Sequence, residues 1–393
     1  MIYPYHTPID TLHNLGEGFF ETISKEVTGI PSNTNPKSQL FNANKNLIKN
    51  ALERIIIPSV FGELSARRNG SDKIHYFRLL LGLLAITTDF LSPKARIVIA
   101  ASSTIANGMY TESQGLELIL DQMCAATRWF LSETSPEYMT IKTHEVLCHL
   151  PEITRLMGNT SCLSTFQFES AYKFILKGYT SSMTRGRLEH LGSKFIVHKE
   201  VRRELAHRAL SEPSEPLRRF ISKCPGLFST SISWNNSIAK FDDADKFPHE
   251  DLCRNYSSLS VGVLKLVSRY GNSSTKDDFF YAKMKDGVKR VYRFVAAVVL
   301  DGTVSVRVEK VKEVDINSRF MSLELCARTL DGTDLYYGLE VVKHLRGYCG
   351  IAEGYLSGER EFVDIDDIIG MAAYVPVEDN FIFLNANGCP VHN

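Results

Sequence analysis

Two groups of acidic residues and histidines in this chain of 393 residues could take part in acid–base or metal chemistry. The first is Asp10 with His13; Pro4 and Pro8 disfavour helix before Asp10, and apolar residues at helical spacing follow it. A carboxylate at the end of a strand is rigidly held and can face a metal ion. An aspartate at such a boundary more commonly caps the following helix, so both interpretations stay open.

The second group begins with His144 and His149 and ends with Glu169 and Lys173. Five residues turn a helix through about 140°, so these histidines are not predicted to share a face as a zinc-binding pair would. Pro151 is expected to end the helix close to His149. Taken alone, each histidine is interpreted as a core or surface residue. Glu169 and Lys173 are interpreted as an i,i+4 pair on a solvated helix face.

A basic stretch runs from Arg185 to Lys223 and holds ten Lys or Arg residues against five Glu, a local charge of +5. The whole chain has 45 basic and 45 acidic residues and therefore no formal net charge. Because the whole chain is not basic, any nucleic-acid surface must be local. The basic stretch can follow the phosphates of a nucleic acid, or it can be a solvated helix face.

Several other classes of function are excluded as leading interpretations. The sequence contains no P-loop, GxSxG or HExxH, and its eight cysteines form no CxxC pair, which argues against a zinc site built from cysteine pairs. The most apolar segment, Phe77 to Ile86, is too short to cross a membrane and predicts a buried helix. We find no signal peptide and expect an intracellular protein.

The chain is expected to have an α+β fold that changes character near residue 261. The predicted helices span residues 38–57, 73–91, 93–107, 112–133, 141–150 and 186–207. Residues 208–260 are interpreted as a connector. From 261 to 393, apolar and polar residues alternate, and Asp-Gly pairs at 286–287, 301–302 and 331–332 lie between the alternating runs. This pattern is typical of hairpins and predicts a small β-rich barrel or sandwich.

Taken in order, these pieces resemble the transposases of the CACTA (En/Spm-like) group, whose catalytic domain has an RNase H-like fold. Asp10, His13 and Gly18 match the family's D-x-x-H-x-x-x-x-G stretch. After a long helical insertion, the family's second stretch is matched by His144, His149, Pro151, Gly158, Ser164, Phe166, Phe168 and Glu169. The related Transib and V(D)J-type recombinases show the same order, with a Lys after the last Glu, as Lys173 is here. The resemblance covers most of the chain. The Trp that often precedes the last Glu segment and the cysteine pair that would complete a zinc site are absent.

The resemblance implies a cut-and-paste DDE DNA transposase, in which three carboxylates hold two Mg²⁺ or Mn²⁺ ions. Asp10 and Glu169 would be the second and third of these carboxylates, and His144 with His149 a zinc-binding or structural pair. The candidates for DNA binding are Lys173, Arg185, Arg187, Lys199, Arg202 and Arg203. Residues 1–207 would form a partial RNase H-like catalytic region with a large helical insertion, followed by the connector 208–260 and the β-rich domain 261–393.

Only nine residues precede Asp10, so the first catalytic aspartate and the central strands of an RNase H-like sheet have no place in the chain as given. We therefore expect a nuclear, transposase-derived protein that does not catalyse strand transfer. Without the sheet, the apolar side of the helix 11–27 is expected to be exposed and to favour self-association. Two alternatives stay open. One is a non-catalytic DNA- or protein-binding module. The other is an unrelated helical protein with a β-rich interaction module, in which Asp10 and Glu169 lie far apart.

Overall fold

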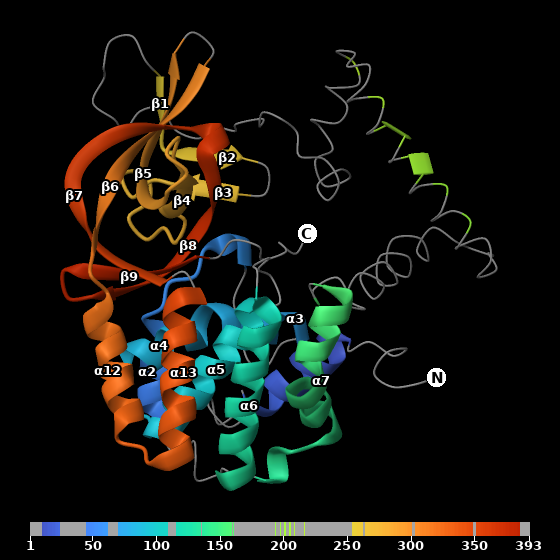
Figure 1. The fold of residues 1–393 in the computed structure, drawn as a ribbon. Helices are drawn as coiled ribbons and strands as arrows, with labels where there is room; N and C mark the ends of the chain where they lie inside the picture. Colours follow the sequence, from blue (N-terminus) through green and yellow to red (C-terminus); the bar gives the residue numbers. More distant parts are fainter. Residues whose placement is uncertain are drawn as a thin grey trace.

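A computed structural model describes most of two regions of the chain, one helical and one rich in strands. The described residues are 10–23, 45–61, 70–108, 115–134, 136–158, 160, 254–261, 264–300, 303–348 and 351–385, with single helical positions at 193, 197, 200, 201, 204, 205, 208 and 216. The expected α+β class is confirmed (Figure 1). Most of the predicted helix 186–207 lies outside the described residues.

The first region is helical, as the apolar spacing predicts. Its elements are η1 (Thr11–Phe20), α2 (Lys45–Glu53), η2 (Ser59–Phe61), α3 (Gly70–Tyr76), η3 (Phe77–Leu81), α4 (Gly82–Thr87), α5 (Pro93–Gly108), α6 (Leu116–Thr134), η4 (Pro136–Tyr138) and α7 (Ile141–Met157). The segment Phe77 to Ile86 is buried throughout, as predicted. The prediction for the helix 11–27 is wrong in one respect: its apolar side is not exposed. Leu15, Phe19 and Phe20 are fully buried, because η1 packs on α3 and α7 instead of a sheet.

Pro151 does not end the helix that carries the two histidines. α7 continues to Met157 with Pro151 inside it, and it stops where Gly158 takes a positive φ of 79°. Proline removes one helical hydrogen bond. Burial of Leu150 and Ile153 on either side of Pro151 offsets that loss, because both side chains belong to the apolar core.

The second region is built on a closed antiparallel barrel. Its strands are β1 (Arg254–Tyr256), β2 (Ser258–Val261), β3 (Leu264–Val267), β4 (Phe279–Lys283), β5 (Lys289–Leu300), β6 (Thr303–Val314), β7 (Ile351–Asp364), β8 (Ile368–Val377) and β9 (Asn380–Asn385). The sheet order β5-β4-β8-β9-β7-β6 closes where β6 pairs with β5. The barrel prediction is confirmed, but β1 and most of β2 fall in the stretch predicted as a connector. No parallel strands occur in the described part, and an RNase H-like core is not confirmed there.

One of the three Asp-Gly predictions is confirmed as a hairpin, because Asp286–Gly287 joins β4 to the antiparallel strand β5. The pair Asp301–Gly302 lies outside the described residues, although β5 and β6 on either side of it are paired. The third is wrong, because Asp331–Gly332 joins two helices, α12 (Asn317–Arg328) and α13 (Gly332–Tyr348). The buried positions of α13 are Gly338, Val341, Val342 and Leu345. Their spacing is that of one helix face, and it prevails over the alternation of the same segment.

The barrel and the helices share one apolar core. Alternate residues of β8 and β9, namely Ala373, Val375, Ile382 and Leu384, belong to the same cluster as the helices. The helices α12 and α13 leave the barrel and pack against α4, α5 and α6, as Figure 1 shows below the barrel. Ile56 forms an isolated antiparallel bridge with Tyr374 of β8. The segment between α2 and η2 is therefore attached to the barrel wall.

Candidate functional site

The element η1 places Asp10 and His13 at the edge of the helical region. Burial of Leu15, Phe19 and Phe20 fixes one face of η1, and the Phe20 ring stacks on Phe77 with centroids 4.4 Å apart. The polar residues are thereby left on the other side. Asp10 directly precedes the helix, at the position of a helix cap, and its Oδ2 lies 2.5 Å from His13 Nδ1. The two residues singled out in the sequence are therefore in direct contact.

The helix α7 carries the second predicted group. Thr140 caps its start by accepting a hydrogen bond from the Thr143 backbone N–H at 3.3 Å. Val146, Leu147 and Leu150 are buried in the core, and Glu145 and Cys148 contact η1 and α6, respectively.

The two elements meet through polar contacts between residues that are 131 positions apart. Asn14 of η1 donates a hydrogen bond from Nδ2 to the Glu145 carboxylate of α7. The two elements approach so closely here that a Cβ atom added to Gly18 would lie 2.9 Å from the side chain of Lys142. A shallow depression of about 470 Å³ lies beside this contact, lined in part by Glu17, Gly18, Thr140 and Lys142. The structure thus brings the D-x-x-H stretch next to the first histidine segment. Sequence reasoning did not single out the Asn14–Glu145 contact, because no local pattern links the two residues.

The prediction that His144 and His149 lie on different faces of the helix is wrong at the level of their rings. The two rings meet edge to face, with centroids 5.3 Å apart. The angle of about 140° describes where the side chains leave the backbone. Imidazole side chains are long enough to turn toward each other across that angle.

The described donor atoms of this region do not form a cluster that could bind a divalent metal. No group of three or more His, Cys, Asp or Glu side chains in the described part of the chain could hold a metal ion. Asp10 is partnered by His13 instead. The described residues therefore give no support to the two-metal site that the resemblance implies, nor to the zinc-binding alternative for the paired histidines. Glu169 lies outside the described residues, so its separation from Asp10 is not defined.

All six predicted DNA-binding residues also lie outside the described residues. They are Lys173, Arg185, Arg187, Lys199, Arg202 and Arg203. The nearby described positions, such as Glu204 and Arg208, are helical, and these two side chains form an i,i+4 ion pair at 2.9 Å. This contact agrees with a solvated helix face as well as with a basic stripe.

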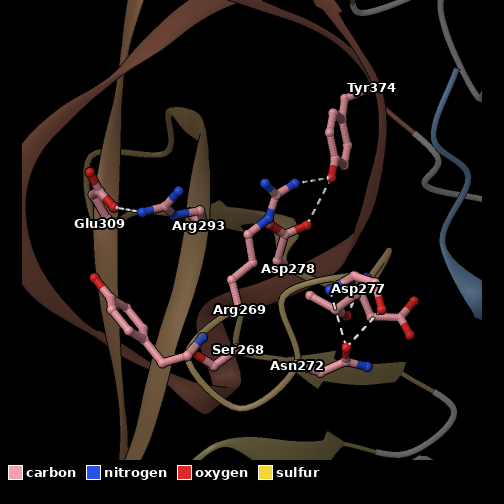
Figure 2. Close-up of polar contacts among 11 residues, drawn as sticks. Ser268, Arg269, Asn272, Asp277, Asp278, Arg293, Glu309 and Tyr374 are labelled. Carbon is pink, nitrogen blue, oxygen red and sulfur yellow. Dashed lines mark hydrogen bonds and ion pairs between the residues drawn. The ribbon is translucent and has the colours of Figure 1, made fainter. Parts of the chain in front are cut away.

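A second polar network, which the sequence did not indicate, lies within the barrel (Figure 2). Arg269 Nε donates to Asp278 Oδ2 at 2.5 Å, and Arg269 Nη2 donates to the Tyr374 hydroxyl at 2.8 Å. Tyr374 in turn donates to Asp278 Oδ1 at 3.0 Å. The side chain of Asp278 is fully buried, whereas that of Arg269 is 37% exposed.

Burial dominates the electrostatics of this network. It raises the pKa of Asp278 above the ordinary carboxyl value, although the Arg269 guanidinium and the Tyr374 hydroxyl act in the opposite direction. Burial also raises the pKa of Tyr374 well above its ordinary value. These three groups are hydrogen-bond partners of one another, so we interpret the network as a structural one that stabilises the barrel. The only local signal was the Asp277-Asp278 pair before the apolar strand β4.

Comparisons with protein-family models, with curated proteins and with solved structures give no match for this chain. Among the helices of the described part, none is long and apolar enough to cross a membrane.

Proposed function

We propose that this chain is derived from a DDE transposase and that it binds DNA without cutting it. The observation that supports this proposal is the packing of η1 on α7. That packing brings Asp10 and His13 to the helix that carries His144 and Glu145. The resemblance assigns both stretches to one catalytic region, and their contact agrees with that assignment.

The non-catalytic part of the proposal rests on the donor atoms. A two-metal nuclease site needs carboxylates on both ions. The resemblance assigns only Asp10 and Glu169 of this chain to that role. In the described part, the carboxylate of Asp10 is bound by His13 and that of Glu145 by the amide of Asn14. A nuclear location and a local DNA surface belong to the same proposal.

The proposal is tested by measuring DNA binding to the 393-residue chain with fluorescence anisotropy at several salt concentrations. We expect an affinity that falls steeply with salt, because each phosphate contact releases counterions. A double variant, Arg202→Gln with Arg203→Gln, should lower the salt slope by about one for each lost contact. The matched control, Arg328→Gln with Lys343→Gln, removes two exposed charges from α12 and α13 and should leave binding unchanged.

The same samples are incubated with labelled duplex DNA in Mg²⁺ or Mn²⁺ to measure cleavage. We expect none. Absence of DNA binding at low salt would overturn the proposed function. Metal-dependent cleavage that is lost in both Asp10→Asn and Glu169→Gln would overturn its non-catalytic part and show that the chain holds a working site.

A further inference from the structure

Cys148 of α7 lies between a base and a cation that come from two different helices. Its Sγ is 3.4 Å from Nδ1 of His144, one turn earlier on α7. On the other side, Arg128 of α6 donates from Nη1 to the same sulfur at 3.4 Å. Cys148 is partly exposed, and His144 and Arg128 are exposed. A small reagent in solution can therefore approach the sulfur.

The guanidinium of Arg128 has no carboxylate partner within the described residues. Its pKa lies above the ordinary arginine value chiefly because of the hydrogen bond with Cys148. The thiolate is the nucleophilic form of cysteine, and a cation beside the sulfur can pair with it as it forms. An imidazole within hydrogen-bond reach can accept the thiol proton. The three side chains thus supply a nucleophile, a proton acceptor and a positive charge.

We propose that Cys148 is a reactive thiol that peroxides modify. His144 Nδ1 takes the thiol proton, and the sulfur attacks one oxygen of the peroxide. The S–O bond forms as the O–O bond breaks, and the departing hydroxide takes the proton from His144 and leaves as water. Cys148 is oxidised by two electrons to the sulfenic acid, and the peroxide is reduced.

The other two cysteines of the described region differ in ways that make them internal controls. Cys124 is buried, and burial strongly raises the pKa of its thiol. Cys326 is partly exposed like Cys148, but burial raises the pKa of its thiol as well, and this outweighs the effect of nearby Arg96. Exposure alone therefore does not separate Cys148 from Cys326. The difference lies in the imidazole beside Cys148.

The experiment measures the alkylation rate of each cysteine in the folded full chain with iodoacetamide, by mass spectrometry. In parallel, sulfenic acid formed with hydrogen peroxide is trapped with dimedone. We expect Cys148 to react about tenfold faster than Cys326 at neutral pH, and to form the adduct while Cys326 does not. Arg128→Gln and His144→Gln should each slow the reaction of Cys148 several-fold. The control Arg155→Gln, which removes an exposed arginine of α7 that does not contact Cys148, should change neither rate.

The wild-type comparison of Cys148 with Cys326 needs no variant, so it stands even where a substitution impairs folding. Equal rates for the two cysteines would overturn the proposal. So would a rate at Cys148 that neither Arg128→Gln nor His144→Gln alters. The inference does not depend on DNA binding, since a chain that binds no DNA could still show the same reactive thiol.

Discussion

The Arg269–Asp278–Tyr374 network allows a sharp test, because one atom can be removed from its centre. The substitution Tyr374→Phe deletes the hydroxyl that donates to Asp278 at 3.0 Å and accepts from Arg269 at 2.8 Å. The ring itself keeps its packing, including the edge-to-face contact with Phe279 at 4.7 Å. The change therefore isolates two hydrogen bonds to charged groups.

The magnitude follows from the different exposure of the two partners. A hydrogen bond to a charged group contributes about 1.5–3 kcal/mol, and an unsatisfied buried group costs a similar amount. The Asp278 side chain is fully buried, so its lost bond counts in full. Arg269 is 37% exposed, and water can replace much of its lost bond. We expect Tyr374→Phe to lower the free energy of unfolding by about 2 kcal/mol.

The same substitution at Tyr281 is the matched control. Tyr281 belongs to the same apolar cluster as Tyr374, and its buried hydroxyl has no hydrogen-bond partner among the described residues. Removing a hydroxyl that is desolvated and unsatisfied should be neutral or stabilise the fold by up to about 1 kcal/mol. Both variants are compared by urea unfolding, followed by circular dichroism. Equal effects of the two substitutions would refute the reasoning, because the hydrogen bonds to Asp278 and Arg269 are the difference between them.

Two further predictions concern the packing of α13 and of the barrel. Burial acts to raise the pKa of Asp334, but its hydrogen bonds with Lys94 and Trp129, both at 2.6 Å, outweigh burial and lower it. A carboxyl whose pKa is lower in the folded chain than in the unfolded chain stabilises the fold at pH values above its ordinary pKa. Asp334→Asn should therefore lower the melting temperature near neutral pH, and the difference from wild type should shrink as the pH falls below about 4; a constant difference across that range would contradict it. Gly354→Ala would bring its new methyl within 2.6 Å of Val311 and 2.8 Å of the Lys312 carbonyl oxygen. It should cost about 1–3 kcal/mol in urea unfolding, and an unchanged midpoint would show that β6 and β7 can separate to admit it.

Sequence periodicity located most of the described helices and the barrel, because the buried positions of each element are apolar residues at helical or alternating spacing. Asp10 and His13 are three residues apart at a helix start, a spacing that allows their contact although we did not predict it. The segment that forms α13 misled the prediction, because its apolar residues fit both an alternating and a helical spacing. The choice between them is made by α5, α6 and α12, which pack on α13, with Gly338 against Ala327 of α12. Such tertiary selection is not encoded within the segment itself.

Contacts between distant residues could not be predicted in the same way. Arg269 and Tyr374 are 105 positions apart, and Asn14 and Glu145 are 131 positions apart. For Asn14 and Glu145, only the order of motifs in a resembling family suggested that their segments meet. The cluster around Cys148 had one local signal, the i,i+4 spacing of His144 and Cys148. Arg128 completes that cluster from another helix.

The division of the chain at residue 260 does not describe how the fold is held together. The helices α12 and α13 follow that point in sequence, yet they pack within the helical region. Asp334 accepts hydrogen bonds from α5 and α6, and Ser59 donates to Asp277 beside the barrel through both its backbone and its hydroxyl. A chain cut at 260 would therefore expose the apolar faces of α5 and α6 as well as lose the barrel. Loss of helical structure in such a fragment would follow from these shared contacts, so a function of either part is best measured on the whole chain.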